Sequence, residues 1–240
     1  MHATAPLDIA ANASTAPAPA DMQVVEERDA AGQLLSRCGL AGGLPHGRME
    51  RFAPDGTLLL EANYVAGKLS GWLRNYDAAG EPVLASHYAG GLPHGPSESY
   101  LQGRLACREH YVNGVLEGER NCYGPAGELV AQAVFRRGLL EGEAIWLHEG
   151  VVVRRSRFRA GKLEGETRSY AADGTLTLSE PYRADLLHGT ARRFDEAGRV
   201  SWQRDYTDGK PRGEWRAAAA TDNGAAAPSF SRRLERWVRG

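Results

Sequence analysis

The stretch Gly161-Lys-Leu-Glu-Gly-Glu-Thr-Arg-Ser-Tyr-Ala-Ala-Asp-Gly174 is the clearest copy of a unit that recurs along almost the whole chain. Its middle glycine, Gly165, has counterparts separated by 23 or 24 residues: Gly47, Gly71, Gly95, Gly118, Gly142, Gly189 and Gly213. Its last glycine, Gly174, has counterparts with the same period: Gly32, Gly56, Gly80, Gly103, Gly127, Gly150 and Gly198. A fixed period of this length indicates stacked supersecondary units rather than a single-core domain.

Both halves of the unit have the alternation of β-strands. After Gly174, the apolar residues Leu176, Leu178 and Tyr182 are two or four positions apart, which keeps them on one face of a strand. Trp72, Arg74 and Tyr76 repeat the period of two in the other half of an earlier unit. The sequence therefore predicts two strands of roughly seven residues in each unit.

The aromatic residues fall into two columns of the repeat. One column lies five residues after the middle glycine and contains Phe52, Tyr76, Tyr100, Tyr123, Tyr170 and Phe194. The other lies three residues before the next unit's first glycine and contains Tyr64, Tyr88, Tyr111, Phe135, Phe158, Tyr182 and Tyr206. Stacked in register, such residues form cross-strand ladders, in which each neighbouring pair contributes ~0.2–1 kcal/mol relative to alanine.

Two kinds of turn join the strands. Asp55-Gly56 and Asp173-Gly174 are typical of tight hairpins that need a positive φ, and Gly-Lys-Leu-Glu-Gly at 161–165 forms the second turn. We therefore predict an all-β fold: an elongated single-layer antiparallel sheet of tandem β-hairpins, with fourteen to sixteen strands. Open sheets of more than ~10 strands usually curl, so the array should bow into a trough. A β-solenoid is the second choice, because it needs no hairpin signal at both ends of the unit.

Composition divides the chain into three segments. Residues 1–21 are rich in Ala and Pro, and we predict a disordered tail there. The repeat array occupies residues 22–216. Residues 217–240 begin with a loop, and 229–239 have the pattern of a short amphipathic helix that caps the apolar end of the array.

The unit Gly-Lys-Leu-x-Gly-x-x-x-x-Tyr-x-x-x-Gly-x-Leu, as it stands at 161–176, resembles the MORN (membrane occupation and recognition nexus) repeat. It is most similar to the bacterial variant in YwqK-type antitoxins of toxin–antitoxin systems. Phased copies across residues 29–216 carry the resemblance, although Asp185 replaces the first glycine, Leu147 an aromatic residue and Pro211 the central leucine. The resemblance implies a scaffold that binds other molecules, with a cognate toxin as the implied partner; some members of the wider family have been linked to phospholipids.

Charge and cysteine content constrain the partners and the compartment. The formal net charge is −1, so no global field draws the chain to nucleic acid, and we expect no nucleic-acid partner. No signal peptide is evident, and unpaired thiols at Cys38, Cys107 and Cys122 fit a reducing cytoplasm, or the periplasm if a signal peptide has been removed. Cys107 and Cys122 fall on consecutive predicted strands and could be neighbours, but we favour a role as small buried residues.

Catalytic and metal chemistry have little support in the sequence. His46, His94 and His188 share one turn position, but equivalent residues of hairpins two repeats apart are about 20 Å apart, since strands lie ~4.8 Å apart. A zinc ion needs ligands at ~2 Å, so we interpret this position as a tolerant, solvated turn. No nucleophile, metalloprotease or phosphate-loop motif is present. We expect no enzyme activity, no catalytic or metal site and no cofactor.

One run of residues suggests a partner surface. Phe158 fixes one aromatic face, so Arg155, Arg157 and Arg159 project from the other, and Arg136 and Lys162 extend them into a basic stripe. We favour a solvated face paired with neighbouring glutamates. The functional alternative is a docking surface for an acidic protein.

The function that we predict is non-enzymatic protein binding, in the form of an antitoxin- or immunity-like neutralisation of a toxin. Two other classes stay open. One is a membrane- or phospholipid-associated scaffold, which we do not favour; the other is an accessory domain for an enzyme on another chain. Sedimentation with anionic vesicles separates the first alternative from the prediction.

Overall fold

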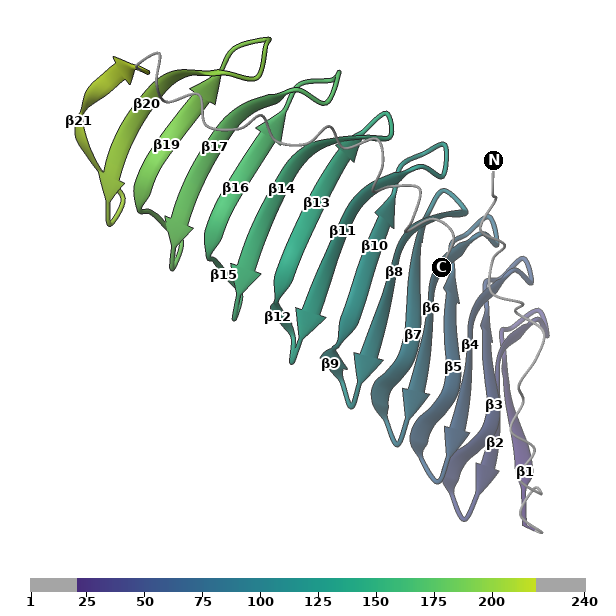
Figure 1. The fold of residues 1–240 in the computed structure, drawn as a ribbon. Coiled ribbons are helices and arrows are strands. Elements are labelled where there is room, and N and C mark those ends of the chain that lie inside the picture. Colours follow the sequence, from purple (N-terminus) through teal and green to yellow (C-terminus); the bar gives the residue numbers. More distant parts are fainter. Residues whose placement is uncertain (1–20, 219–240) are drawn as a thin grey trace, which may run out of the picture. The chain divides into compact units, whose positions relative to one another are not determined.

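The computed structural model describes residues 21–218, which form one open antiparallel sheet of 21 strands in hairpin order (Figure 1). No helix occurs among these residues, and the prediction of an all-β sheet of tandem hairpins is confirmed. The helix predicted at 229–239 lies outside the described residues, as does the predicted tail except for Asp21.

The described chain comprises two compact units, residues 21–128 with 135–138 and residues 129–134 with 139–218. The first unit contains β1 (Gln23–Arg28), β2 (Leu34–Ala41), β3 (Leu44–Phe52), β4 (Leu58–Val65), β5 (Lys68–Tyr76), β6 (Pro82–Ala89), β7 (Leu92–Leu101), β8 (Arg104–Val112), β9 (Val115–Leu116) and β10 (Gly118–Tyr123). β11 (Leu129–Arg136) has residues in both. The second contains β12 (Leu139–Leu140), β13 (Gly142–His148), β14 (Val151–Arg159), β15 (Lys162–Leu163), β16 (Gly165–Tyr170), β17 (Leu176–Arg183), β18 (Leu186–Leu187), β19 (Gly189–Phe194), β20 (Val200–Thr207) and β21 (Lys210–Ala217).

The strand count exceeds the fourteen to sixteen expected, and four of the 21 strands arise because a glycine interrupts a longer strand. β9, β12, β15 and β18 are two-residue segments, each followed by one residue outside the ladder and then by a glycine such as Gly165, whose φ is 94°. Only glycine adopts this conformation without a steric penalty. The Glu164 N–H still donates to the Arg157 carbonyl oxygen (2.9 Å), so the interruption is a bulge within a strand.

Several of the short turns at one end of the strands are built on an aspartate. Asp173 Oδ1 accepts a hydrogen bond from the Thr175 N–H (2.8 Å), and the backbone hydrogen bond from Thr175 lowers the pKa of the Asp173 carboxyl. Asp55 accepts from Thr57 (2.9 Å) in the same way. The tight Asp-Gly turns expected from the sequence therefore have a self-capping aspartate.

The turns at the other end of the strands are tied to each other. Ala160, with a φ of 48°, donates its N–H to Glu141 Oε2 in the preceding turn (2.8 Å), and Gly161 donates to the Leu140 carbonyl oxygen (2.9 Å). The same kind of hydrogen bond, from the backbone N–H of a turn residue to a side chain of the preceding turn, joins Ala66 to His46 (3.5 Å), Asn113 to His94 (3.3 Å), Arg137 to Glu117 (2.7 Å), Ala184 to Glu164 (3.0 Å) and Asp208 to His188 (3.4 Å). The position interpreted as a tolerant solvated turn is instead a hydrogen-bond acceptor in these copies.

The two aromatic columns lie on opposite faces of the sheet and at opposite ends of the strands. We call the two faces of the sheet face A and face B. In each repeat, the residue two positions after the middle glycine, such as Thr167, lies on face A, and the residues one and three positions after it lie on face B. Tyr182 is on face A, opposite Leu187, and Tyr170 is on face B, opposite Leu176. All thirteen aromatic residues of the two columns are half-buried.

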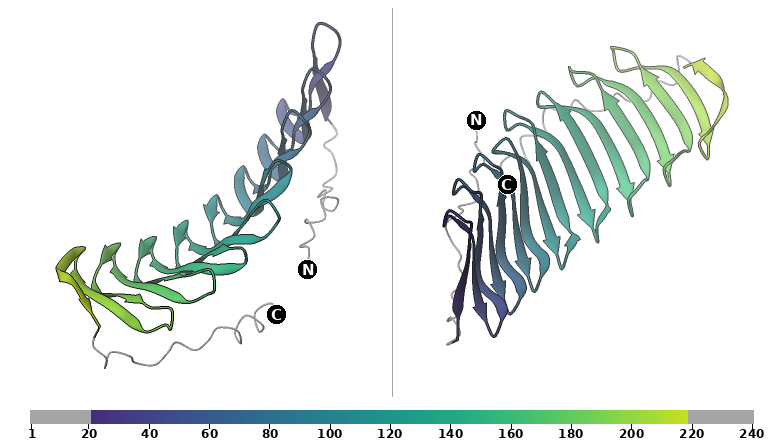
Figure 2. Two further views of the ribbon diagram at one scale, coloured as in Figure 1. Left: turned by 90° about the horizontal axis from the view of Figure 1, so that it is seen from above. Right: turned by 180° about the vertical axis from the view of Figure 1, so that it is seen from behind.

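The most buried side chains of face A are small. Ala62, Ala144, Ser156, Thr167 and Ala191 are at most 2% exposed, and they occupy the middle of strands that are bowed along their length (Figure 2). Ala62 lies directly between Met49 and Leu73 in the ladder, so a small residue there packs between two larger ones. The Thr167 hydroxyl donates to Ser156 Oγ (3.1 Å), so the buried hydroxyls are hydrogen-bonded to each other.

A disulfide joins Cys107 on β8 to Cys122 on β10. The two residues are directly opposite in the antiparallel ladder, with Cα atoms 4.1 Å apart. The expectation that both would be unpaired buried thiols is therefore wrong, because strand register places their side chains side by side. Cys38 is a free thiol.

Candidate binding surface

The structure places four residues of the predicted basic stripe together on β14 and β15 and assigns the fifth, Arg136, to the first unit. Arg155 and Arg157 lie in the middle of β14 on face B, and Arg155 forms an ion pair with Glu143 (2.8 Å). Arg159 and Lys162 are opposite each other at the end of β14. Arg136 ends β11 and belongs to the first unit. These arginines do oppose Phe158, but face B is not free of aromatic residues, because the aromatic column that contains Tyr170 lies on it.

Face B of the second unit carries a row of arginines that the sequence analysis missed. The row is defined by directly opposite residues on β13, β14, β16, β17, β19, β20 and β21: Ile145, Arg155, Arg168, Ser179, Arg192, Gln203 and Arg216. We call it the arginine row. It contains no carboxylate.

The adjoining row of face B supplies the acids. Glu143 pairs with Arg155, Glu166 with Arg168, and Asp205 with Arg216 (3.0 Å). The Thr190 hydroxyl (2.6 Å), followed by Arg216, lowers the pKa of the Asp205 carboxyl. Together with Glu214, which follows the middle glycine Gly213 as Glu166 follows Gly165, the two rows hold six arginines and four carboxylates: Arg155, Arg157, Arg168, Arg192, Arg212 and Arg216 against Glu143, Glu166, Asp205 and Glu214.

The equivalent row of the first unit is balanced. It runs through Glu26, Arg37, Glu50, Glu61, Arg74, Ala85, Glu98, Arg108 and Asn121. Arg37 pairs with Glu26 (3.0 Å) and Arg108 with Glu98 (2.8 Å). In this ladder, acids and bases of the same row neutralise each other, so the excess of arginine is a property of the second unit.

One position of the repeat, three residues after the middle glycine, predicts the arginine row. Arg168, Arg192 and Arg216 each follow a middle glycine by three residues, the position at which the first unit has Glu50, Arg74 and Glu98. Comparing the copies column by column would have shown the change from mixed charge to arginine. A contiguous run such as residues 151–159 does not form one surface, because successive side chains of a strand alternate between the two faces of the sheet.

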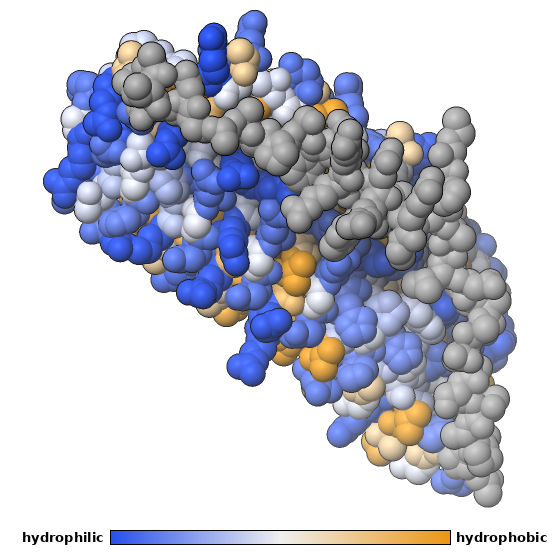
Figure 3. All heavy atoms as spheres, in the orientation of Figure 1, coloured by the Kyte–Doolittle hydropathy of each residue, from blue (hydrophilic) through white to orange (hydrophobic). Residues whose placement is uncertain are grey.

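Face A of the second unit also carries exposed aromatic and basic side chains. Arg154 lies over the Trp146 ring (5.9 Å to its centroid) and Arg193 over the Trp215 ring (4.4 Å). Trp146 is 36% exposed and Trp202 is 46% exposed. Elsewhere, hydrophilic residues dominate the surface seen in Figure 3, with apolar residues in small groups.

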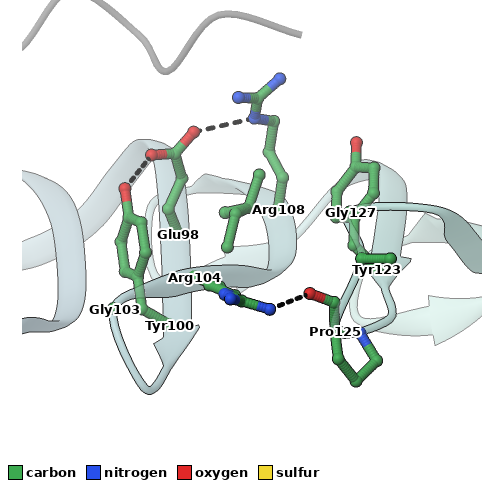
Figure 4. A pocket seen from close by; sticks show the side chains of 10 residues that line it. Glu98, Tyr100, Gly103, Arg104, Arg108, Tyr123, Pro125 and Gly127 are labelled. Atoms are coloured by element: carbon green, nitrogen blue, oxygen red, sulfur yellow. Dashed lines mark hydrogen bonds and ion pairs between the residues drawn. The ribbon is translucent and has the colours of Figure 1, made fainter. Parts of the chain in front are cut away.

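A pocket of about 530 Å³ opens on face B of the first unit, between Tyr100 and Tyr123 (Figure 4). At its edge, the buried Glu98 carboxylate accepts hydrogen bonds from the Tyr100 hydroxyl (2.5 Å) and from Arg108 Nε (2.8 Å). Burial, and then the bond to Glu98, raises the pKa of Tyr100. Glu98 is satisfied within the protein, so it offers this pocket no unpaired carboxylate.

The histidines considered as metal ligands each serve another purpose. His46, His94 and His188 accept turn amides, and His188 Nδ1 also lies 3.1 Å from Asp208 Oδ1. Across residues 21–218, no group of three or more His, Cys, Asp or Glu side chains is placed to hold a metal ion. In the same part of the chain, no helix has the length and apolarity to cross a membrane.

A family model described as "MORN repeat variant" matches residues 45–66, which contain most of β3 and β4. No curated protein matches the chain. Among solved structures, a GtfA/B complex bound to UDP and GlcNAc is 14% identical with a TM-score of 0.19, over 45% of this chain and 21% of that one. A TcdB2-TccC3-Cdc42 structure is 11% identical with a TM-score of 0.21, over 78% and 14%. The chain thus spans at most about a fifth of these proteins, and such low scores carry no argument.

Proposed function

We propose that this chain is a non-enzymatic repeat scaffold that binds an acidic protein through the arginine row of its second unit, and that it neutralises that protein as an antitoxin or immunity protein does. The MORN repeat at 45–66 supports the coarser part, a repeat scaffold for binding. The neutralising role is our own extension, since no homologue supports the resemblance to YwqK-type antitoxins.

The excess of arginine on face B of the second unit carries the proposal. Six arginines stand against four carboxylates there, whereas the first unit, built on the same hairpins, neutralises its row internally. Arg155 and Arg168 are directly opposite each other, and such like charges repel, so the free protein gains no stability from bringing them together. An acidic partner surface would supply the missing carboxylates.

The size of the rows fits a protein partner. The arginine row crosses seven strands, which at ~4.8 Å per step is about 29 Å. A standard interface of ~800 Å² per partner needs about 20–30 residues, which is more than one hairpin can present on one face. Contacts should therefore extend over at least three consecutive hairpins, and the site is a surface rather than a pocket.

Charge reversal tests the proposal. The variant Arg155→Glu/Arg168→Glu/Arg192→Glu should lose binding to the partner captured by the wild-type chain from its native source, mostly through slower association with a weaker salt dependence. A matched control is Arg199→Glu, an exposed arginine paired with Asp195 in a turn of the same unit. If the captured protein is a toxin, co-expressed wild-type chain and control should restore growth, and the triple variant should not.

Two results would overturn the proposal. Unchanged partner binding by the triple variant, with unchanged circular dichroism, would remove the arginine row from the site. Sedimentation of the wild-type chain with phosphatidylserine vesicles, abolished in the triple variant, would assign the row to an anionic membrane instead.

The cellular compartment stays a prediction. The disulfide removes two of the three unpaired thiols that favoured a reducing cytoplasm.

A further inference from the structure

A second row crosses the same unit on the opposite face. Directly opposite residues on β13, β14, β16, β17, β19 and β20 define it: Trp146, Arg154, Ser169, Leu178, Arg193 and Trp202. We call it the tryptophan row. It is symmetric in chemistry, with a tryptophan and an arginine at each end and Ser169 and Leu178 between them.

Three arginines of this face are stacked on aromatic rings and form no ion pair within the part of the chain that the structure describes. Arg154 lies over Trp146, Arg193 over Trp215 and Arg204 over Tyr206 (5.6 Å to the centroid). Within residues 21–218, no carboxylate lies at ion-pair distance from Arg154, Arg193 or Arg204, unlike Arg155 and Arg168 on face B. Stacking holds each guanidinium in place, which lowers the entropy lost when it binds an anion.

We propose that the tryptophan row is an interaction surface for an extended acidic polypeptide segment, distinct from the arginine row and independent of the function proposed for it. Tryptophan, tyrosine and arginine are the residue types that dominate binding energy at protein interfaces. Trp146 and Trp202 are exposed, and the unpaired arginines beside them complement carboxylates rather than amines.

The register sets the spacing that the segment must have. Arg154 and Arg193 are three strand steps apart, which is about 14 Å at ~4.8 Å per step. An extended chain advances ~3.4 Å per residue, so two carboxylates must be at least four residues apart. An apolar residue midway, on the same side of the extended segment, would contact Leu178. The sequence motif expected in the bound segment is therefore acidic-x-apolar-x-acidic, or a longer form with more residues between the two acids.

The distribution of acids favours a polypeptide over single-stranded nucleic acid. Carboxylates flank the row at both strand ends of the unit: Glu141, Glu164, Asp185 and Asp208 in the turns at one end, and Asp173 and Asp195 at the other. A nucleic-acid strand carries a charge on every phosphate and would be repelled by these rims. A segment with two carboxylates places charge only where Arg154 and Arg193 lie.

Fluorescence anisotropy with the full chain and a labelled peptide tests the inference. The probe has two aspartates four residues apart with a leucine midway, and its control has the same composition with the aspartates adjacent. We expect saturable binding of the probe, at least about tenfold weaker in Trp146→Ala/Trp202→Ala. Arg193→Gln should weaken binding and reduce its salt dependence. Trp72→Ala, in the first unit, is the matched tryptophan control and should bind as the wild type does.

Arg192→Gln separates the two faces, because Arg192 and Arg193 are adjacent in β19 but project oppositely. If Arg192→Gln weakened peptide binding as much as Arg193→Gln does, the peptide would lie on face B and the inference would be overturned. This outcome does not depend on whether the arginine row binds a partner protein. Equal binding of the adjacent-aspartate peptide, no binding of the probe, or tighter binding of an oligouridylate would overturn it as well. Circular dichroism confirms that each variant is folded.

Discussion

The Glu117 carboxylate accepts a 2.7 Å hydrogen bond from the backbone N–H of Arg137, which lies in the next turn of the first unit at a φ of 51°. This bond is one member of a series in which an acceptor just before the middle glycine holds the following turn. Neighbouring hairpins are thereby fixed to each other at the turns as well as through the strand ladder.

Removing one such acceptor should loosen the turn that it holds. In Glu141→Ala, the Ala160 N–H loses its partner, and we expect the free energy of unfolding to fall by about 1 kcal/mol. Glu141→Gln keeps an acceptor oxygen and should lose less. Urea denaturation of the three proteins measures both changes. Equal stability of the alanine and glutamine variants would show that the carboxyl side chain does not hold the turn.

The aromatic columns should contribute less per ring than a closed core would. Phe135 is half-buried, so Phe135→Ala should cost about 1.5–2.5 kcal/mol, roughly half of the 3–5 kcal/mol found for fully buried rings. Denaturation midpoints with an unchanged m-value would measure this cost. A loss below ~0.5 kcal/mol would show that these rings do not hold the sheet together.

The small buried residues should tolerate little added volume. Ala144 is 2% exposed and lies opposite Ser156. Ala144→Leu should destabilise the protein by about 1–3 kcal/mol through overpacking, whereas Ala144→Ser should be tolerated, since serines occupy equivalent positions. Thermal unfolding of both variants checks this. A leucine variant as stable as the wild type would mean that the bowed strands leave space there.

These positions show what the sequence could and could not predict. The glycine period and the aromatic columns were enough for the hairpin array, because each copy repeats the same turn chemistry. Direct opposition across strands was not deduced, so the pairing of Cys107 with Cys122 and the arginine row through Arg168 and Arg192 were missed. The disulfide and the arginine row both depend on the register between strands. A one-residue bulge changes this register, and the periodicity along a single strand does not determine it.

Reducing the disulfide should destabilise the first unit. Cys107 and Cys122 are 15 residues apart, and a closed loop of this length stabilises a fold by about 3 kcal/mol in the chain-entropy treatment. Denaturation with and without dithiothreitol should show this difference in the wild type. The variant Cys107→Ala/Cys122→Ala should not respond to the reductant, although it keeps Cys38. A response in that variant, or none in the wild type, would contradict the prediction.

The aspartates of the short turns should make stability fall at acid pH. Backbone hydrogen bonds, from Thr57 to Asp55, from Thr175 to Asp173 and from Arg199 to Asp195, lower the pKa of each carboxyl in the folded chain.

A carboxyl whose folded pKa lies below its unfolded value of about 3.9 stabilises the fold above that value, and this contribution is lost as the pH falls through the folded pKa. The variant Asp55→Asn/Asp173→Asn/Asp195→Asn keeps the acceptor oxygens but does not titrate, so its free energy of unfolding should fall less between about pH 5 and pH 2. Carbon-13 NMR titration of the wild-type carboxyls gives the three pKa values independently. Parallel pH profiles for wild type and variant would show that these turns do not contribute to the acid sensitivity of the fold.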